Sequence, residues 1–519
     1  MKRSAAGIAW LFACAIALGG CASVPATLPA PARTRDALAA RIDALVGQAR
    51  FATASWGIKV VSLDTGRTLY ARNADKLAVP ASNAKLYTAS LALDTFGSDY
   101  RIATSLYATA GADALGVLPG DLVLYGRGDP ALGTDADGHA TTAWADQLAA
   151  ALAARGITRV RGALIADDTY FAGPPIGPGW EADDLQTDYA TPASALSVQE
   201  NTFTLRIDTA HGSCCEATVD PAGAGVQVVD LGANPAPGDT TGIGLYRPPG
   251  SRQLFVYGGL SPGSAPRSYT LAVPDPALLA GNLLRDALAR RGIAVDGGVR
   301  VTHWPQRDPA LDGATRVHLA DVASPPLADI VRHALKHSDN LYAQLMLLQV
   351  GAQTAADGTC ADREQAPPST DDWGLCALRA MLRRIGIADD AALFEEGSGL
   401  SRKDLVTPSA TVALLAWVRR QPFAAALYDA LPVAGVDGTL RNRMHGTAAA
   451  GNMRAKTGSL TYTYTLAGYV TDAAGEHLAF ALMLDSYRRP TDAGGHAPGP
   501  RADLDAIATL LAGYRGRGG

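Results

Sequence analysis

Two side chains near the start of the sequence have the types and the spacing of a serine nucleophile and its base. Ser82 and Lys85 lie three residues apart at the beginning of an apolar segment. On a helix that begins there, both side chains would share one face, within hydrogen-bonding reach. A buried lysine loses its proton readily and can activate a serine, whereas an arginine stays protonated. An ordinary helix-capping serine and a surface lysine would, however, show the same spacing.

Lysine is scarce in this chain, which makes the position of each lysine informative. Only seven of the 45 basic residues are lysine, at positions 2, 59, 76, 85, 336, 403 and 456. Lys85 is the only one with a serine three residues before it. The positive end of a helix that begins at Ser82 would also favour an oxyanion at that residue.

Two further motifs add the remaining groups of a serine acyl-transfer site. Ser338-Asp339-Asn340 is the only S-x-N in the chain, and Lys456-Thr457-Gly458 is the only K-T-G. The motifs S-x-x-K, S-D-N and K-T-G occur together in class A β-lactamases and penicillin-binding proteins. We expect Ser338 to relay a proton and Asn340 to hold a substrate amide on one side of a cleft.

The K-T-G segment is expected to form the opposite wall of that cleft. Lys456 would add positive potential, and Gly458 would let the substrate backbone approach. The hydroxyls of Thr457 and Ser459 would bind a terminal carboxylate. The backbone N–H groups of Ser82 and Ser459 would form the oxyanion hole, in which each donor contributes on the order of 3 kcal/mol.

The sequence resembles the peptidase S13 family, the class C low-molecular-mass penicillin-binding proteins of the penicillin-binding protein 4 type. Stretches that match include "LYGRGDPALG", "IADDTYF", "ALSVQENTF" and "GSGLSR", and the likeness runs from about residue 40 to the C-terminal helix. The spacing of 256 residues from Ser82 to Ser338 also fits this family, which inserts extra domains between the motifs. Three positions depart from the family pattern, namely Ser459 for threonine, Gln344 for glutamate and Glu396 for aspartate.

The resemblance implies an α/β (α+β) fold. A penicillin-binding-protein/β-lactamase-like transpeptidase domain, with a central antiparallel sheet flanked by helices, would comprise residues 37–103 and 318–519. Inserted β-rich segments, two domains by expectation, would occupy residues 104–317. The residues themselves suggest a sheet assembled from both ends of the chain, since an early hairpin is matched by three late strands.

The activity implied by the resemblance is that of a serine-type D-Ala-D-Ala carboxypeptidase acting on peptidoglycan stem peptides. The same site could also cut peptide crosslinks, which would be an endopeptidase activity, and β-lactams would acylate Ser82. The alternatives are a β-lactamase or esterase of the same superfamily and a non-catalytic cell-wall binding protein.

No metal or organic cofactor is expected at this site. His333 and His337 are four residues apart on an expected helix, but no catalytic glutamate lies between them and no third ligand is obvious. The net charge of −5 gives no reason to expect nucleic acid as a partner.

The N-terminus is typical of an exported protein. Lys2 and Arg3 precede a short apolar run that ends in Leu18-Gly19-Gly20-Cys21, which resembles a bacterial lipobox. Residues 1–20 would then be a signal peptide, Cys21 the lipidated residue, and 21–36 a Pro/Ala-rich tether. Cleavage near Ala26 is the alternative. Either would place the protein in the periplasm, with a lipid anchor to the membrane in the first case.

Cysteine usage fits an oxidising compartment. Cys360 and Cys376 bracket a Gly/Asp/Pro-rich loop and are the expected disulfide pair. The partners of Cys214 and Cys215 stay open.

Overall fold

The computed structural model describes most of the chain beyond the N-terminal segment. The described residues are 32–135, 138–209, 216–232, 242–261, 263–306, 316–360, 368–489 and 499–516. The signal peptide, Cys21, Cys214 and Cys215 lie outside them. The predicted tether is two residues too long, because helix α1 (Arg35–Val46) begins inside it, with the Thr34 side chain accepting from Ala37 N at 3.2 Å. Within the described ranges, no helix is long and apolar enough to cross a membrane.

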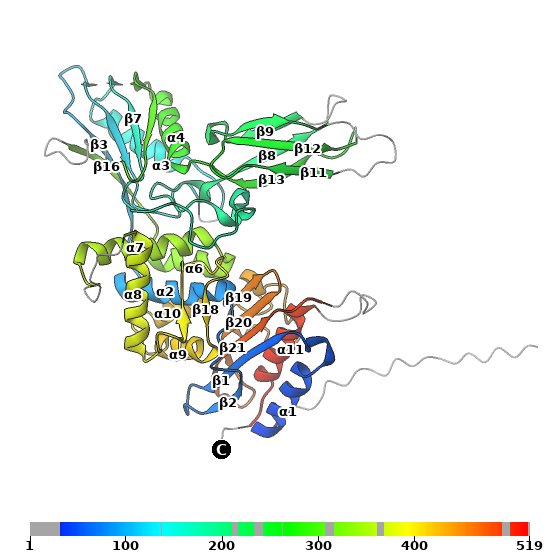
Figure 1. Ribbon diagram of the computed structural model, residues 1–519. Coiled ribbons are helices and arrows are strands. Elements are labelled where there is room, and N and C mark those ends of the chain that lie inside the picture. Colours follow the sequence, from blue (N-terminus) through cyan, green and yellow to red (C-terminus); the bar gives the residue numbers. More distant parts are fainter. Residues whose placement is uncertain are drawn as a thin grey trace, which may run out of the picture. The chain divides into compact units, whose positions relative to one another are not determined.

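A five-stranded antiparallel sheet combines the two ends of the chain, as the sequence predicts (Figure 1). Its order is β19-β20-β21-β1-β2, so that the first strand pairs directly with the last. The strands are β1 (Ser55–Ser62), β2 (Thr68–Arg72), β19 (Arg454–Leu460), β20 (Thr463–Thr471) and β21 (His477–Asp485). Strand β19 is at the edge of this sheet.

Apolar side chains on both faces of the sheet explain why helices cover each face. On β21, Leu478, Phe480 and Leu482 join one buried cluster, while Ala479 and Ala481 join another. This period of two is that of a strand buried on both sides. The first cluster contains α1 and α11 (Pro500–Ala512).

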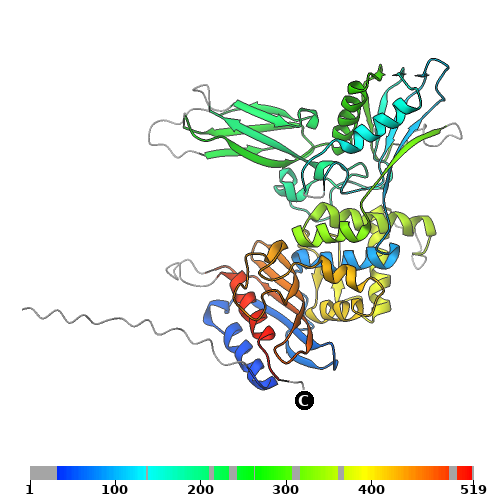
Figure 2. The same ribbon diagram turned by 180° about the vertical axis from the view of Figure 1, so that it is seen from behind.

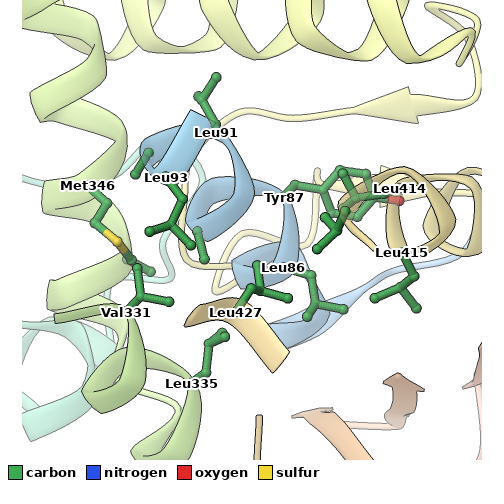
Figure 3. Close-up of a cluster of buried hydrophobic side chains, with 14 of the residues drawn as sticks. Leu86, Tyr87, Leu91, Leu93, Val331, Leu335, Met346, Leu414, Leu415 and Leu427 are labelled. Carbon is green, nitrogen blue, oxygen red and sulfur yellow. The ribbon is translucent and has the colours of Figure 1, made fainter. Parts of the chain in front are cut away.

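The second cluster is built mainly from helices and holds the segment that carries Ser82. Figure 3 shows Leu86 and Tyr87 of α2 among side chains of its neighbours. The helices are α2 (Ala84–Phe96), α6 (Leu327–His337), α7 (Asn340–Asp357), α8 (Thr370–Ile385), α9 (Pro408–Val418) and α10 (Ala424–Ala430). Tyr87 is fully buried and its hydroxyl pairs with that of Thr411 at 2.9 Å, which ties α2 to α9.

The insertion begins and ends on paired antiparallel strands, β3 (Ala103–Ala108) and β16 (Val317–Ala323). The predicted limits of 104 and 317 therefore cut through both strands, and the strands themselves give 103–323 as the extent. The two strands belong to a sheet of order β15-β7-β5-β3-β16. Its other strands are β5 (Leu122–Tyr125), β7 (Leu164–Asp167) and β15 (Val299–Thr302).

In the described ranges, the rest of the insertion contains three small sheets and two α-helices (Figures 1 and 2). The first sheet has the order β14-β6-β4 and contains β14 (Ala294–Val295), β6 (Arg159–Val160) and β4 (Val117–Leu118). The second has the order β13-β8-β9 and contains β13 (Arg267–Ala272), β8 (Thr202–Asp208) and β9 (Glu216–Asp220). The third has the order β10-β12-β11 and contains β10 (Gln227–Asp230), β12 (Gln253–Gly259) and β11 (Gly242–Tyr246). The helices are α3 (Ala143–Ala154) and α4 (Pro276–Arg290). Both helices lie in the segment that was expected to be β-rich, and the alanines of α3 carry little periodic signal. One apolar cluster runs from β3 through both helices to β8 and β12.

The predicted disulfide is present, between Cys360 and Cys376, with Cα atoms 6.3 Å apart. It connects the segment after α7 to α8, and these two helices pack on each other. Helix α7 begins at Asn340 of the S-x-N motif.

Reduction of this disulfide is expected to lower the free energy of unfolding by about 3 kcal/mol, because the unfolded chain gains loop entropy. Urea unfolding with and without reductant measures the loss. The double variant Cys360→Ser/Cys376→Ser should have the same free energy of unfolding as the reduced native protein, and reductant should not change it. A reductant effect of the same size in that variant would contradict the assignment.

Candidate active site

Ser82 and Lys85 meet as the sequence predicts. Ser82 lies in a single 3₁₀ turn, η2 (Ala81–Asn83), that runs directly into α2. Lys85 is fully buried, and its Nζ lies 3.0 Å from Ser82 Oγ, 2.5 Å from Asn340 Oδ1 and 2.6 Å from the Ser398 carbonyl oxygen. Burial lowers the pKa of Lys85 to about 8, against the opposing pull of the carboxylates of Glu396, Asp339 and Asp404. A neutral amine next to a serine hydroxyl can accept its proton.

The carbonyl that faces Lys85 is held by a buried carboxylate. Glu396 accepts the backbone N–H groups of four residues, Ser398, Gly399, Leu400 and Ser401, at 2.5–3.3 Å. Burial and the neighbouring Glu396 raise the pKa of Asp404. The sequence identifies Glu396 only as a departure from the family pattern. Its structural task depends on backbone groups that no side-chain motif reveals.

Gln344 supports the same loop from α7. Its Oε1 accepts the Gly397 N–H at 2.8 Å, and its Nε2 donates to Asp371 Oδ1. Burial raises the pKa of Asp371 to about 7. The amide of Gln344 can satisfy a donor and an acceptor at once, which a carboxylate could not do.

The second serine and lysine form a pair that resembles the first. Ser338 follows α6 in a left-handed conformation (φ 63°), and Lys456 Nζ donates to its Oγ at 2.8 Å and to the Thr457 carbonyl at 2.7 Å. Lys456 is fully buried, and burial followed by the charge of Lys85 lowers its pKa well below the usual value. The sequence led us to expect positive potential from Lys456, whereas its burial disfavours the charged form. Its contact suits proton relay through Ser338.

Asn340 links the motif to the insertion. Its Oδ1 accepts from Lys85, and its Nδ2 donates to the Tyr189 carbonyl at 2.7 Å. The sequence predicts that this amide holds the substrate, whereas in the structure both of its ends contact protein. The segment around Tyr189 therefore reaches the catalytic cleft, which no local pattern in the insertion indicated.

The K-T-G strand brings the edge of the sheet against the Ser82 turn. A Cβ on Gly458 would lie 2.1 Å from Thr465 Oγ1 and 2.8 Å from the Pro80 carbonyl oxygen. Thr465 Oγ1 itself donates to Pro80 O at 2.8 Å. Gly458 is thus required by the packing of β19 and β20 on the nucleophile's turn. This differs from the expectation that its role is to admit the substrate backbone.

Gly458→Ala is expected to displace the Ser82 turn and to lower penicillin acylation by roughly 100-fold, since small displacements of reacting groups have effects of that order. The rate of acylation by fluorescent penicillin measures it. Gly111→Ala is the matched control, because an added Cβ there meets nothing within 4 Å. An acylation rate equal to that of the control would contradict the packing role.

Two cavities open on the same three serines, Ser82, Ser338 and Ser459. The first, of about 400 Å³, is lined by the threonines and arginines of two segments, Thr439, Arg441, Arg443 and Thr457. Thr457 Oγ1 donates to Thr439 Oγ1 at 2.8 Å. This half of the cleft presents hydroxyl and guanidinium groups, which suit a terminal carboxylate.

The second cavity, of about 500 Å³, brings the insertion into the cleft. Glu181, Asp184 and Tyr189 of the insertion line it together with Arg402. Arg402 Nε lies 3.1 Å from Glu181 Oε1, and the Tyr189 hydroxyl donates to Asp184 Oδ1 at 2.7 Å. Charges of both signs thus flank the serines on this side. Arg402 lies in the family-like stretch "GSGLSR", which is the only signal in the sequence that pointed to this cavity.

Three side chains with possible metal-ligating atoms lie together behind the S-x-N motif. Glu200, His333 and Asp339 bring one ligand atom each within 4.8 Å of the others. Burial lowers the pKa of His333, but hydrogen bonds to Asp339 and Glu200 outweigh it and raise the pKa to about 9. His333 Nε2 lies 3.2 Å from Glu200 Oε1 and 3.8 Å from Asp339 Oδ2, so in this structure the imidazole is paired with both carboxylates. Its ring centroid lies 4.6 Å from that of His337.

The sequence of this chain is similar to those of D-alanyl-D-alanine carboxypeptidases. The chain matches the model of the D-Ala-D-Ala carboxypeptidase 3 (S13) family over residues 38–501. A D-alanyl-D-alanine carboxypeptidase of Actinomadura sp. (strain R39) is 35% identical, over 92% of this chain and 84% of the relative. D-alanyl-D-alanine carboxypeptidase DacB of Haemophilus influenzae is 28% identical, over 80% of this chain and 82% of the relative.

A solved structure shares the fold over nearly the whole chain. The crystal structure of penicillin binding protein 4 (dacB) from Haemophilus influenzae superimposes with a TM-score of 0.76 at 25% identity, covering 91% of this chain and 99% of that one. The same protein complexed with a novel β-lactam superimposes with a TM-score of 0.70 at 23% identity. With the family model covering most of its length, the chain belongs to the D-Ala-D-Ala carboxypeptidase 3 (S13) family.

Proposed function

We propose that this serine-type D-alanyl-D-alanine carboxypeptidase cleaves the terminal D-Ala-D-Ala bond of peptidoglycan stem peptides through an acyl-enzyme on Ser82. The observation that carries the residue assignment is the contact of 3.0 Å between Ser82 Oγ and a buried Lys85 whose pKa is lowered to about 8. The same contact accounts for the choice of lysine in a chain that otherwise relies on arginine.

In the first step, Lys85 accepts the Ser82 proton as Oγ attacks the carbonyl of the penultimate D-Ala. Backbone N–H groups of Ser82 and Ser459 stabilise the oxyanion. As the C–N bond breaks, the proton that Lys85 accepted passes to the leaving amine through the hydroxyl of Ser338, which Lys456 holds at 2.8 Å, and Lys85 is neutral again. Water then attacks the ester and gives a proton to Lys85, and this proton returns to Ser82 Oγ as the ester bond breaks.

The two halves of the cleft suit the two sides of the scissile bond. Thr457, Ser459 and Arg441 would bind the carboxylate of the leaving D-Ala. The cavity with Glu181, Asp184 and Arg402 would take a stem-peptide side chain that carries both an ammonium and a carboxylate, such as that of meso-diaminopimelate. Cleavage of crosslinks at the same bond type would give the endopeptidase activity.

β-Lactams would acylate Ser82, and the resulting acyl-enzyme would be hydrolysed slowly. Glu396 commits its carboxylate to four backbone N–H groups, so it is not free to activate a deacylating water as a β-lactamase glutamate would. The binding of a β-lactam by the Haemophilus protein supports the same expectation.

Release of D-alanine from a synthetic pentapeptide, together with mass spectrometry of digested sacculi, tests the activity and the choice of bond. Rapid steady turnover of nitrocefin without D-alanine release would favour a β-lactamase or esterase. Penicillin that labels the protein equally well without Ser82 would overturn the site.

We also propose that the protein is exported to the periplasm and held at a membrane through Cys21. The charged start, the apolar run and the lipobox-like residues before Cys21 support this proposal. Metabolic labelling with a radioactive fatty acid should mark the native chain and not Cys21→Ser. Fractionation that finds both chains in the soluble periplasmic fraction would exclude the anchor.

A further inference from the structure

A cavity of about 370 Å³ lies away from Ser82, between the insertion and the helices α7 and α8. We call it the distal cavity. Residues of the insertion line most of it, and Leu348 of α7 and Asp371 of α8 complete it. It shares no lining residue with the two cavities at Ser82. Its volume is within the range of small-molecule sites.

One wall of the distal cavity is an ordered polar network. Asp168 accepts from Ser194 Oγ at 2.7 Å and lies 3.0 Å from His303 Nδ1. Asp275 accepts from Arg252 at 2.9 Å, and His303 Nε2 lies 3.7 Å from the same carboxylate. Ser194 and Asp275 are buried, with 3% and 9% of their surface exposed. These groups are held in place before any ligand arrives, which lowers the entropic cost of binding.

The charges of this wall balance. Hydrogen bonds with Asp168 and then Asp275 raise the pKa of His303 to about 10, so the imidazole is protonated at neutral pH. Two cations, His303 and Arg252, thus face two carboxylates. Asp371 on the other side is 6% exposed, and burial raises its pKa to about 7, so near neutral pH it can donate as well as accept a hydrogen bond. The cavity offers many hydrogen-bonding groups without a large net charge.

Flat apolar surface lies next to these polar groups. Trp304 is 44% exposed although it is a large aromatic residue, and it lines the cavity together with prolines, Pro174, Pro175, Pro192, Pro274 and Pro276. An indole face beside fixed donors and acceptors fits a ligand with an apolar ring face and polar edges. An uncharged pyranose with hydroxyl and acetamido groups has that chemistry.

We propose that the distal cavity binds an N-acetylated hexose unit of the peptidoglycan glycan strand. The proposal rests on the proposed function, since it adds a binding site for the polymer that carries the cleaved peptide. Leu348 is eight residues along α7 from Asn340, which corresponds to about 12 Å of helix. Four extended residues of a stem peptide span up to about 14 Å, which matches the length of α7 between Leu348 at the distal cavity and Asn340 at the catalytic cleft.

The test uses a peptide-free tetrasaccharide of alternating N-acetylglucosamine and N-acetylmuramic acid, titrated into the full-length protein by calorimetry. The protein is first acylated with penicillin, so that the catalytic cleft is blocked. We expect saturable binding that weakens roughly tenfold in Trp304→Ala and in Arg252→Ala, as for the loss of one packing or hydrogen-bonding contact. Trp304→Phe should recover most of the affinity.

Tyr257→Ala is the matched control, because Tyr257 is an aromatic residue of the insertion that is 49% exposed and does not line the cavity. It should bind the tetrasaccharide as the native chain does. No binding by the native chain, or equal binding by all variants, would overturn the proposal. The extent of penicillin acylation in the same samples reports on Ser82 separately. A variant that is fully acylated but binds the saccharide more weakly has therefore lost a contact in the distal cavity and not the catalytic site.

Discussion

Ser82→Ala is expected to abolish covalent labelling by fluorescent penicillin and to lower D-alanine release from a pentapeptide by roughly 10⁴-fold or more, as for other serine acyl-transfer sites. The hydroxyl is the only atom of the residue that forms the acyl bond, and no other described hydroxyl accepts a hydrogen bond from Lys85. Gel fluorescence after a penicillin chase and a coupled assay for D-alanine measure the two losses.

Ser90→Ala provides the matched control on the same helix. Ser90 is buried, and its hydroxyl donates to the Leu86 carbonyl at 2.6 Å, away from Lys85. We expect labelling at the native rate in this variant. Equal loss in both variants would indicate damage to α2 and would contradict a specific role of Ser82.

Lys85→Arg is expected to lower the acylation rate by roughly 10³-fold while the protein stays folded, a loss in the range of general-base catalysis. Arginine preserves a cation but cannot give up a proton, so it separates the role of charge from the role of base. Lys403→Arg, at an exposed position, is the control. Stopped-flow acylation measures both.

The pH profile provides a second readout for Lys85. Burial lowers its pKa to about 8, and the base is the neutral form, so acylation should rise with pH and level off above about 8. Below that value, each pH unit should lower the rate about tenfold. Burial, and then the charge of Lys85, also lower the pKa of the neighbouring Lys456 well below its usual value. A rate that is constant from pH 6 to 9 would exclude Lys85 as the base.

The sequence predicts which residues meet at the site because each motif is a short, unbroken group. Ser82 with Lys85 needs only one helical turn, and the K-T-G segment needs only one strand. The contacts that join these motifs to other segments of the chain were not predictable in the same way. The contact of Asn340 with the Tyr189 carbonyl joins two segments far apart in the chain through a backbone atom, and a backbone atom has no residue type to recognise.

The strands of the catalytic sheet were predictable from their apolar patterns. Trp56, Ile58 and Val60 alternate along β1, and β21 is apolar from Leu478 to Leu484, as in a strand buried on both faces.

The limits of the insertion were less accurate, although Gly97 ends α2 before β3 and Pro325 and Pro326 separate β16 from α6. The pairing of β3 with β16 joins segments far apart in the chain, and no local pattern shows it. Helix α3 was not predicted from the sequence, because most of its residues are alanine and its two faces therefore have similar polarity.

The pairing of β1 with β21 sets an order of events during synthesis. The Val79 N–H, three residues before Ser82, donates to Asp485 Oδ2 at 2.8 Å across 406 residues of chain. A ribosome completes the nucleophile's segment long before it produces the strand that secures it. The insertion, bounded by β3 and β16, can close on its own apolar cluster in the meantime, whereas the sheet must wait for the last strand. An unfinished or C-terminally truncated chain would therefore hold Ser82 without its support, and the enzyme would acquire its reactivity only at full length.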